Sequence, residues 1–291
     1  MVMMEYIKEF VHSNNCIFSI LACVFLTISY VSSLYVWRSN LSRDHPTTIK
    51  RRFFSVFCMM ILAPFFCQYF IPEESLKKGD MFQQLGLRWP GLLQASVVPL
   101  FLTAVLFLGP LTMQFLSGIW KLYSEPMYWF TSWQDLIWVR NHIMAPLSEE
   151  WVFRACMLPL LLQCLPPLAA VFVGPLLFGV AHFHHMFEQM KSGYEFKTAL
   201  TISTFQFTYT TVFGAYSSYI FVRTGHFVAP LTAHMFCNHM GFPNFGEIGQ
   251  YPPLQRVVIV CSFILGFTLW CIMLVPLTDP EFYQNKLHWE T

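Results

Sequence analysis

Long uncharged, apolar segments recur along most of this chain. A helix of about 20 residues is long enough to cross the hydrocarbon of a bilayer. Charged or polar breaks separate the segments, which run over 10–37, 53–72, 89–120, 198–222 and 257–278. Each of these segments predicts a membrane-spanning helix.

Two further stretches complete the pattern. The uncharged segment 155–181 is interrupted by Pro166 and Pro167, and proline removes a backbone donor and disfavours helix in the residue before it. We therefore expect one helix to end and another to begin there. The segment 228–245 is shorter and carries polar residues. Together the pattern predicts an all-α polytopic membrane protein with about eight transmembrane helices, or one fewer if a segment is re-entrant.

Composition agrees with a membrane environment. The 291 residues are 55% hydrophobic, 18% aromatic and only 11% charged, whereas soluble domains contain about 25% charged residues. The net charge of +1 and the lack of a basic face beyond the first loop argue against nucleic-acid binding. No repeat, low-complexity tract or linker divides the chain, so we expect a single domain over 1–291.

Basic residues concentrate in the loop after the first apolar segment, which predicts the topology. Positive charge favours the cytosolic side, so the N-terminus is expected to be lumenal or external and the first segment to be a retained signal anchor. The segment 121–142 mixes tryptophans with charges, which fits either an interfacial helix or a loop rich in anchoring aromatics. The basic residues of the loop are Arg38, Arg43, Lys50, Arg51 and Arg52.

Glu149, Glu150 and Arg154 form a charged cluster beside these apolar segments. A charge at the bilayer centre costs roughly 2.5 to 3.5 kcal/mol on insertion scales, so intramembrane carboxylates usually serve a site or a pathway. At about 100° per residue, Glu150 and Arg154 share a helix face, while Glu149 points away on the side of Phe153. One glutamate is therefore expected to be neutralised in a supporting ion pair, and the other to be free for chemistry.

Two later segments carry further polar side chains. Phe178 and His182 are one helical turn apart, and His234 and Asn238 have the same spacing. A carboxylate with a nearby histidine can deprotonate water, which contributes about 10² to 10⁴ in rate. An amide and a second histidine can donate hydrogen bonds to an oxyanion, and one such donor contributes about 10² to 10³.

We assign Glu149 and His182 to water activation, and His234 and Asn238 to oxyanion stabilisation. A lone histidine in a membrane helix is often only an interhelical hydrogen bond. Here, however, three separated segments would each need an independent explanation for their polarity. The neighbouring His184, His185 and His239 fit a rim or membrane-interface position equally well.

These motifs, Glu149-Glu150-x3-Arg154, Phe178-x3-His182 and His234-x3-Asn238, resemble in their order the three motifs of the type II CAAX prenyl endopeptidases. These are the Ras-converting enzymes of the CPBP (Abi) membrane-protease family. The motifs cover the second half of the chain, and the size and helix count fit the whole of it.

The resemblance implies a multi-pass protease of the endoplasmic reticulum membrane that removes the last three residues of prenylated CAAX proteins. It also implies helices around a conical cavity accessible from the cytosol and the bilayer, with Glu150, Arg154 and Phe178 supporting the four catalytic residues. The expected partners are membrane lipid and farnesylated or geranylgeranylated CAAX proteins such as Ras-like small GTPases. No cofactor or metal is expected.

The sequence leaves two alternatives open. In the first, His182, His185 or His234 binds zinc together with a glutamate, although the chain lacks His-Glu-x2-His and Asn238 is a poor zinc ligand. In the second, the same polar residues bind an ion or a lipid in a non-enzymatic scaffold or transporter, because fold resemblance alone does not establish activity.

Overall fold

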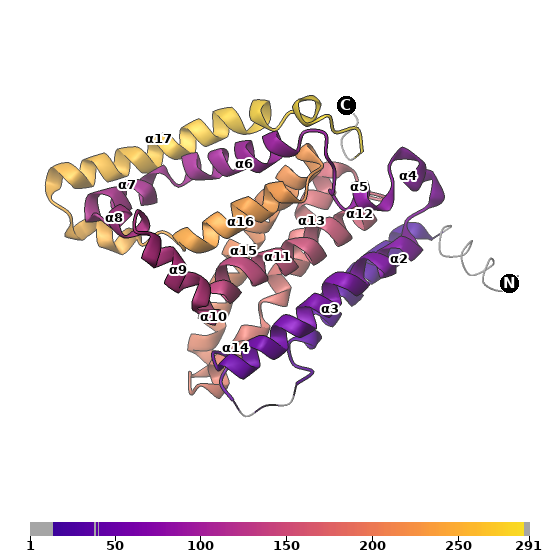
Figure 1. The fold of residues 1–291 in the computed structure, drawn as a ribbon, viewed down its shortest axis with the longest axis horizontal. Helices are drawn as coiled ribbons and strands as arrows, with labels where there is room; N and C mark the ends of the chain where they lie inside the picture. The colour runs from indigo at the N-terminus through magenta and orange to yellow at the C-terminus, as the bar shows by residue number, and fades with distance from the viewer. Residues whose placement is uncertain (1–13, 38, 40, 288–291) are drawn as a thin grey trace, which may run out of the picture.

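Helices form most of the computed structural model, which describes residues 14–37, 39 and 41–287 (Figure 1). No strand occurs in that part of the chain. Arg38 and the start of the first apolar segment lie outside the described residues. The longer helices are α2 (Asn15–Ser33), α3 (Pro46–Phe70), α6 (Leu92–Leu106), α7 (Leu108–Ser117), α13 (Pro167–Ala181), α15 (Phe196–Thr224), α16 (Val228–Met240) and α17 (Pro253–Leu277). The shorter ones are α4 (Glu73–Lys78), α5 (Met81–Gln84), α8 (Trp120–Tyr123), α9 (Pro126–Gln134), α10 (Leu136–Val139), α11 (Ala145–Glu150), α12 (Met157–Leu161) and α14 (His184–Lys191).

Proline and glycine set several helix boundaries where the sequence predicts them. Pro167 and Pro253 occupy the first turns of α13 and α17, where their missing N–H has no intrahelical partner to lose. The break predicted at Pro166 is confirmed, since α12 ends at Leu161. Gly225 terminates α15 with φ at 66°, a left-handed conformation that glycine adopts without strain.

The helices spread apart like a fan (Figure 1). Helices α6 and α17 pack side by side along one edge, and α2 and α3 pack together along the other. Between these edges lie α16, which contacts α6 and α15, and α13, which packs along α15. This arrangement places α11, α13 and α16, the helices that carry the polar motifs, in the middle of the molecule.

Several of these helices are able to cross a membrane. Length and apolarity qualify α2, α3, the segment Pro167–Lys191 and α17 among the described residues, with α6 and α7 as one further span if this pair, bent by 73°, is counted together. The all-α polytopic class is therefore confirmed. The count of eight spans is not confirmed, because α16 has only 13 residues and α15 carries many hydroxyl side chains.

The segment 121–142 does not form one helix. It is divided among α8, α9, α10 and the start of a π-helical stretch. Trp129 and Trp133 are exposed there, so both the interfacial and the loop interpretations stay predictions.

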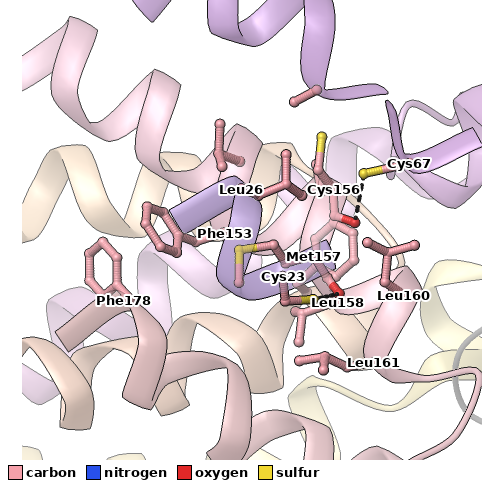
Figure 2. Packing of buried hydrophobic residues seen from close by; sticks show 14 of the residues in the cluster. Cys23, Leu26, Cys67, Phe153, Cys156, Met157, Leu158, Leu160, Leu161 and Phe178 are labelled. Atoms are coloured by element: carbon pink, nitrogen blue, oxygen red, sulfur yellow. Dashed lines mark hydrogen bonds between the residues drawn. The ribbon is translucent and has the colours of Figure 1, made fainter. Parts of the chain in front are cut away.

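An apolar core holds the glutamate-bearing segment against the first two long helices (Figure 2). The Cys23 thiol of α2 donates to the backbone carbonyl of Met157 at 3.7 Å, and the Cys67 thiol of α3 donates to that of Cys156 at 3.5 Å. Phe153 packs edge-on against Phe178 with ring centroids 5.0 Å apart. Close packing of this kind makes the segment after Glu150 a rigid support.

Helix α17 approaches the α6–α7 bend closely because of a glycine. A Cβ atom added at Gly266 would lie 2.5 Å from the backbone oxygen of Val105 and 2.8 Å from Leu108 Cβ. Neither atom belongs to a flexible side-chain end, so the helices would have to separate.

We therefore expect Gly266→Ala to destabilise the protein by about 1–3 kcal/mol through overpacking. The measurement is the thermal unfolding midpoint in detergent. Gly249→Ala is the control, since a Cβ there meets nothing within 4 Å. Equal midpoints for the two variants would show that the close approach does not contribute to stability.

Candidate active site

The two glutamates end a short helix that lies between two π-helical stretches. Helix α11 (Ala145–Glu150) follows the π-helical residues Arg140–Met144 and is followed by Trp151–Cys156, which are also π-helical. Such stretches are rare and frequently occur at functional sites. The π-helical residues thus flank the segment that carries the charged cluster.

Glu150 is fully buried and contacts three side chains, one through an ion pair and two through hydrogen bonds. Arg154 Nη1 lies 3.2 Å from its Oε1, which matches the ion pair predicted from the spacing of four residues. Ser217 of α15 donates to Oε2 at 2.6 Å, and His234 Nδ1 lies 2.6 Å from Oε1. Both carboxylate oxygens are therefore satisfied, as a buried charge requires.

Phe178 completes this buried cluster from α13. The Arg154 guanidinium carbon lies 4.2 Å from the centroid of the Phe178 ring, a cation–π contact that is favourable in a site shielded from water. Both side chains are buried. Phe178, predicted as a supporting residue, therefore covers the Glu150–Arg154 pair.

Glu149 differs from its neighbour because it faces a cavity of about 1140 Å³. Its side chain is 18% exposed, whereas that of Glu150 is fully enclosed. The structure brings the four predicted catalytic residues to this one cavity: its lining includes Glu149, His182, His234 and Asn238. Glu149 Oε2 lies 3.8 Å from His234 Nε2.

The partners of His182 decide which of its nitrogens is available. Nδ1 lies 2.8 Å from the carbonyl oxygen of Phe178, and a carbonyl can only accept, so Nδ1 is the donor. In the neutral ring Nε2 then carries a lone pair. His182 can therefore accept a hydrogen bond from water in the cavity.

His234 has the same arrangement with a carboxylate as the acceptor. Its Nδ1–H donates to Glu150, so Nε2 donates a hydrogen bond only when the ring is doubly protonated. Glu150 Oε1 lies 2.6 Å from Nδ1 and Glu149 Oε2 lies 3.8 Å from Nε2, so a carboxyl group stands on each side of the ring.

Asn238 lies one turn beyond His234 on α16 and is held by a backbone group. Its Nδ2 donates to the carbonyl oxygen of Asn141 at 2.8 Å. The amide nitrogen has two N–H donors, so one remains for another acceptor. Asn141 is the residue after Arg140, at the start of the first π-helical stretch.

The three histidines left ambiguous by the sequence separate into two groups. His184 and His185 line the cavity. His239 instead joins an aromatic cluster, with ring centroids 5.0 Å from Tyr123 and 5.8 Å from both Trp129 and His142.

Sequence reasoning missed Ser217 and Asn141, the partners of Glu150 and Asn238. Ser217 is one of many hydroxyl residues on α15, and Asn141 acts through its backbone. Neither position had a signal that distinguished it in the sequence.

The described residues contain no group of three or more His, Cys, Asp or Glu side chains placed to hold a metal ion. In addition, the permanent positive charge of Arg154 lies beside Glu150, where it would repel a bound cation. This donor set therefore does not fit the zinc site of the first alternative.

The comparisons with known proteins agree with this geometry. Residues 131–240 match the family described as Type II CAAX prenyl endopeptidase Rce1-like. The chain is 43% identical to CAAX prenyl protease 2 of Homo sapiens over 279 residues, which cover 93% of this chain and 84% of that protein. The chain belongs to the type II CAAX prenyl endopeptidase family.

Further relatives of this endopeptidase family come from a plant and from a second mammal. CAAX prenyl protease 2 of Arabidopsis thaliana is 31% identical over 291 residues, with 92% of each chain covered, and that of Rattus norvegicus is 40% identical over 278 residues, covering 93% of this chain and 83% of the rat protein. No solved structure matches the chain. As a member of a protease family, the protein is an enzyme that hydrolyses peptide bonds.

The unlike surroundings of the two glutamates predict unlike effects on the stability of this endopeptidase. Glu150→Ala leaves Arg154 buried without a counter-charge, and breaking a buried pair in this way costs about 3–5 kcal/mol. Glu149→Gln alters a side chain that faces the cavity, so its unfolding midpoint should stay close to that of the wild type. Thermal unfolding of the two purified variants measures the difference, and equal midpoints would contradict the assigned roles.

Proposed function

We propose that this protein removes the C-terminal tripeptide from prenylated CAAX proteins, using water activated by Glu149 and His182. One observation carries the mechanism: of two adjacent glutamates, Glu150 is saturated by buried partners, while Glu149 faces the cavity. The printed names of the relatives support the substrate class.

The first step is the attack of water on the peptide bond after the prenylated cysteine. Glu149 removes a proton from the water, and the His182 Nε2 lone pair orients the same water through a hydrogen bond. The resulting hydroxide forms a bond to the carbonyl carbon, and the carbonyl oxygen gains negative charge.

The oxyanion accepts hydrogen bonds from the remaining N–H of Asn238 and from Nε2–H of His234 in its imidazolium form. Glu150 holds the His234 ring in the orientation that this requires. The C–N bond then breaks as Glu149 returns its proton to the leaving amine. The products are a tripeptide with a free amino terminus and a protein that ends in the prenylated cysteine carboxylate.

The cavity also has apolar walls suitable for a prenyl chain. Much of its lining is aromatic or aliphatic, with residues from α6, α13, α15 and α17, and ligand sites are commonly built this way with a few polar groups. The apolar lining includes Phe107, Phe172, Val212, Phe267, Trp270 and Leu274. We place the farnesyl or geranylgeranyl group against this part of the wall.

The proposed setting is the endoplasmic reticulum membrane, with the cavity open to the cytosol where CAAX proteins such as Ras-like small GTPases are found. Arg43, in the loop before α3, and Arg52, near the start of α3, border the cavity. Their positive charge supports the cytosolic orientation.

The direct test is release of the tripeptide from a farnesylated CAAX peptide by purified protein. Glu149→Gln should lower kcat by about 10² to 10⁴, since general-base help is lost, while Gln keeps the size of the side chain. Full activity in this variant would refute the mechanism. An inactive wild type would favour the scaffold or transporter alternative, and loss of activity with a chelator followed by recovery with zinc would favour the metalloprotease.

Asn238→Ala should lower kcat by about 10² to 10³, because one oxyanion donor is removed. Little change is expected in KM, since the interaction forms only in the transition state. His239→Ala is a control on the same helix, because its ring packs in the aromatic cluster away from the reacting groups. A raised KM with unchanged kcat in Asn238→Ala would assign Asn238 to substrate binding instead.

A further inference from the structure

Arginine side chains form a cationic part of the cavity wall that the proposed mechanism does not use. Among the described residues that line the cavity, those with a formal charge at neutral pH are Arg43, Arg52, Arg140 and Glu149. Three are cations and one is the proposed base. The positive charge of the arginines therefore has to be balanced either by carboxylates of the protein or by a negatively charged ligand in the cavity.

Two of these arginines share one carboxylate. Arg52 Nη2 lies 2.9 Å from Glu188 Oε1, and Arg43 Nη1 lies 3.3 Å from Oε2. The Tyr35 hydroxyl donates to Glu188 at 2.9 Å, and His185 Nδ1 lies 3.2 Å away. Burial and the neighbouring Glu188 raise the pKa of the Tyr35 phenol, which keeps it a donor.

Arg140 pairs instead with Asp44 at 2.8 Å, and Arg43 Nε lies 3.8 Å from the same carboxylate. Three guanidinium groups thus share two carboxylates. Asp44 is 54% exposed, so water and salt weaken its compensation. The cluster carries an excess positive charge beside the cavity.

Arg52 is the best placed to use this charge. Its side chain is only 15% exposed, and among the described residues only its Nη2 makes a hydrogen bond, to Glu188. A guanidinium presents five N–H donors in a planar fork that fits a carboxylate. Arg52 therefore retains donor capacity after its contact with Glu188.

The path from His182 to Arg52 passes through only a few side chains, so a short peptide could reach from one to the other. The His185 ring lies 6.1 Å from that of His182, His185 contacts Glu188, and Glu188 contacts Arg52. Two side chains thus separate Arg52 from His182. Three extended residues cover about 10 Å, a length that can reach past two intervening side chains.

We propose that Arg52, assisted by Arg43, binds the terminal carboxylate of the substrate's X residue. This inference rests on the proposed function. It explains how an endopeptidase would cut a fixed three residues from a chain end, because the main chain carries a carboxylate only at its C-terminus. Charge complementarity of this kind contributes chiefly to specificity.

The test compares two farnesylated peptides that differ only in a C-terminal carboxylate or carboxamide, using the full-length purified protein. The wild type should prefer the acid by about ten- to a hundredfold in kcat/KM, mostly through KM, as expected for a hydrogen bond to a charged group. Arg52→Gln should lose this preference by raising KM for the acid alone. Arg51→Gln is the matched control and should keep it, because Arg51 stacks over Trp37 at 5.8 Å and does not line the cavity.

Glu188→Gln distinguishes recognition from a structural role. It removes the carboxylate that the arginines share, so the preference for the acid should persist or increase. Equal losses on both peptides in Arg52→Gln and Glu188→Gln would mean that the cluster only supports the fold, which overturns the inference. A wild type that cleaves acid and amide equally would also overturn it while the proposed function stands. Release from neither peptide would overturn both.

Discussion

The buried carboxylate of Glu150 is the interaction on which the arrangement of this protein depends. An ionised group without exposure to water is tolerated only when it is paired and hydrogen-bonded. Arg154 supplies the charge, Ser217 and His234 the hydrogen bonds, and Phe178 covers the guanidinium from α13. Satisfying one carboxylate thus fixes the relative positions of α11, α13, α15 and α16. The same contacts set the orientation of His234. The interactions that stabilise the buried carboxylate therefore also determine the geometry of the site.

Adjacent positions on one helix give Glu149 and Glu150 different chemistry. A rotation of about 100° between neighbours turns one carboxylate into the helix packing and leaves the other at the cavity wall. In the proposed mechanism Glu150, paired with Arg154, positions His234, and Glu149 accepts the proton. Two adjacent acids therefore need not compete, because burial and partners separate their roles as in other acid–base pairs.

Local features of this fold could be predicted from sequence, and interactions between distant segments could not. The Glu150–Arg154 pair and the break at Pro166 follow from helix geometry and proline chemistry, which depend only on neighbours. The bond between His234 and Glu150 joins residues 84 positions apart, and its choice of Nδ1 follows from packing. Asn141 holds Asn238 through its backbone oxygen, which any residue type could supply. The number of spans could not be read from the sequence either, because hydroxyl side chains make α15 and α16 less apolar even though several of them, such as Thr208 and Thr232, bond to carbonyls of their own helix.

One part of the cavity wall is apolar and another is cationic. A prenylated peptide likewise has an apolar lipid at one residue and a negatively charged carboxylate at its end. Apolar residues such as Phe267 and Trp270 line one part of its wall, and Arg52 lines another. A substrate with a lipid on one residue and a carboxylate three residues later would place its apolar and charged ends on these two parts. The peptide bond between them would then lie near Glu149 without a need for specific contacts to the intervening side chains. Recognition of both ends would thus tolerate varied sequences while holding the position of cleavage fixed.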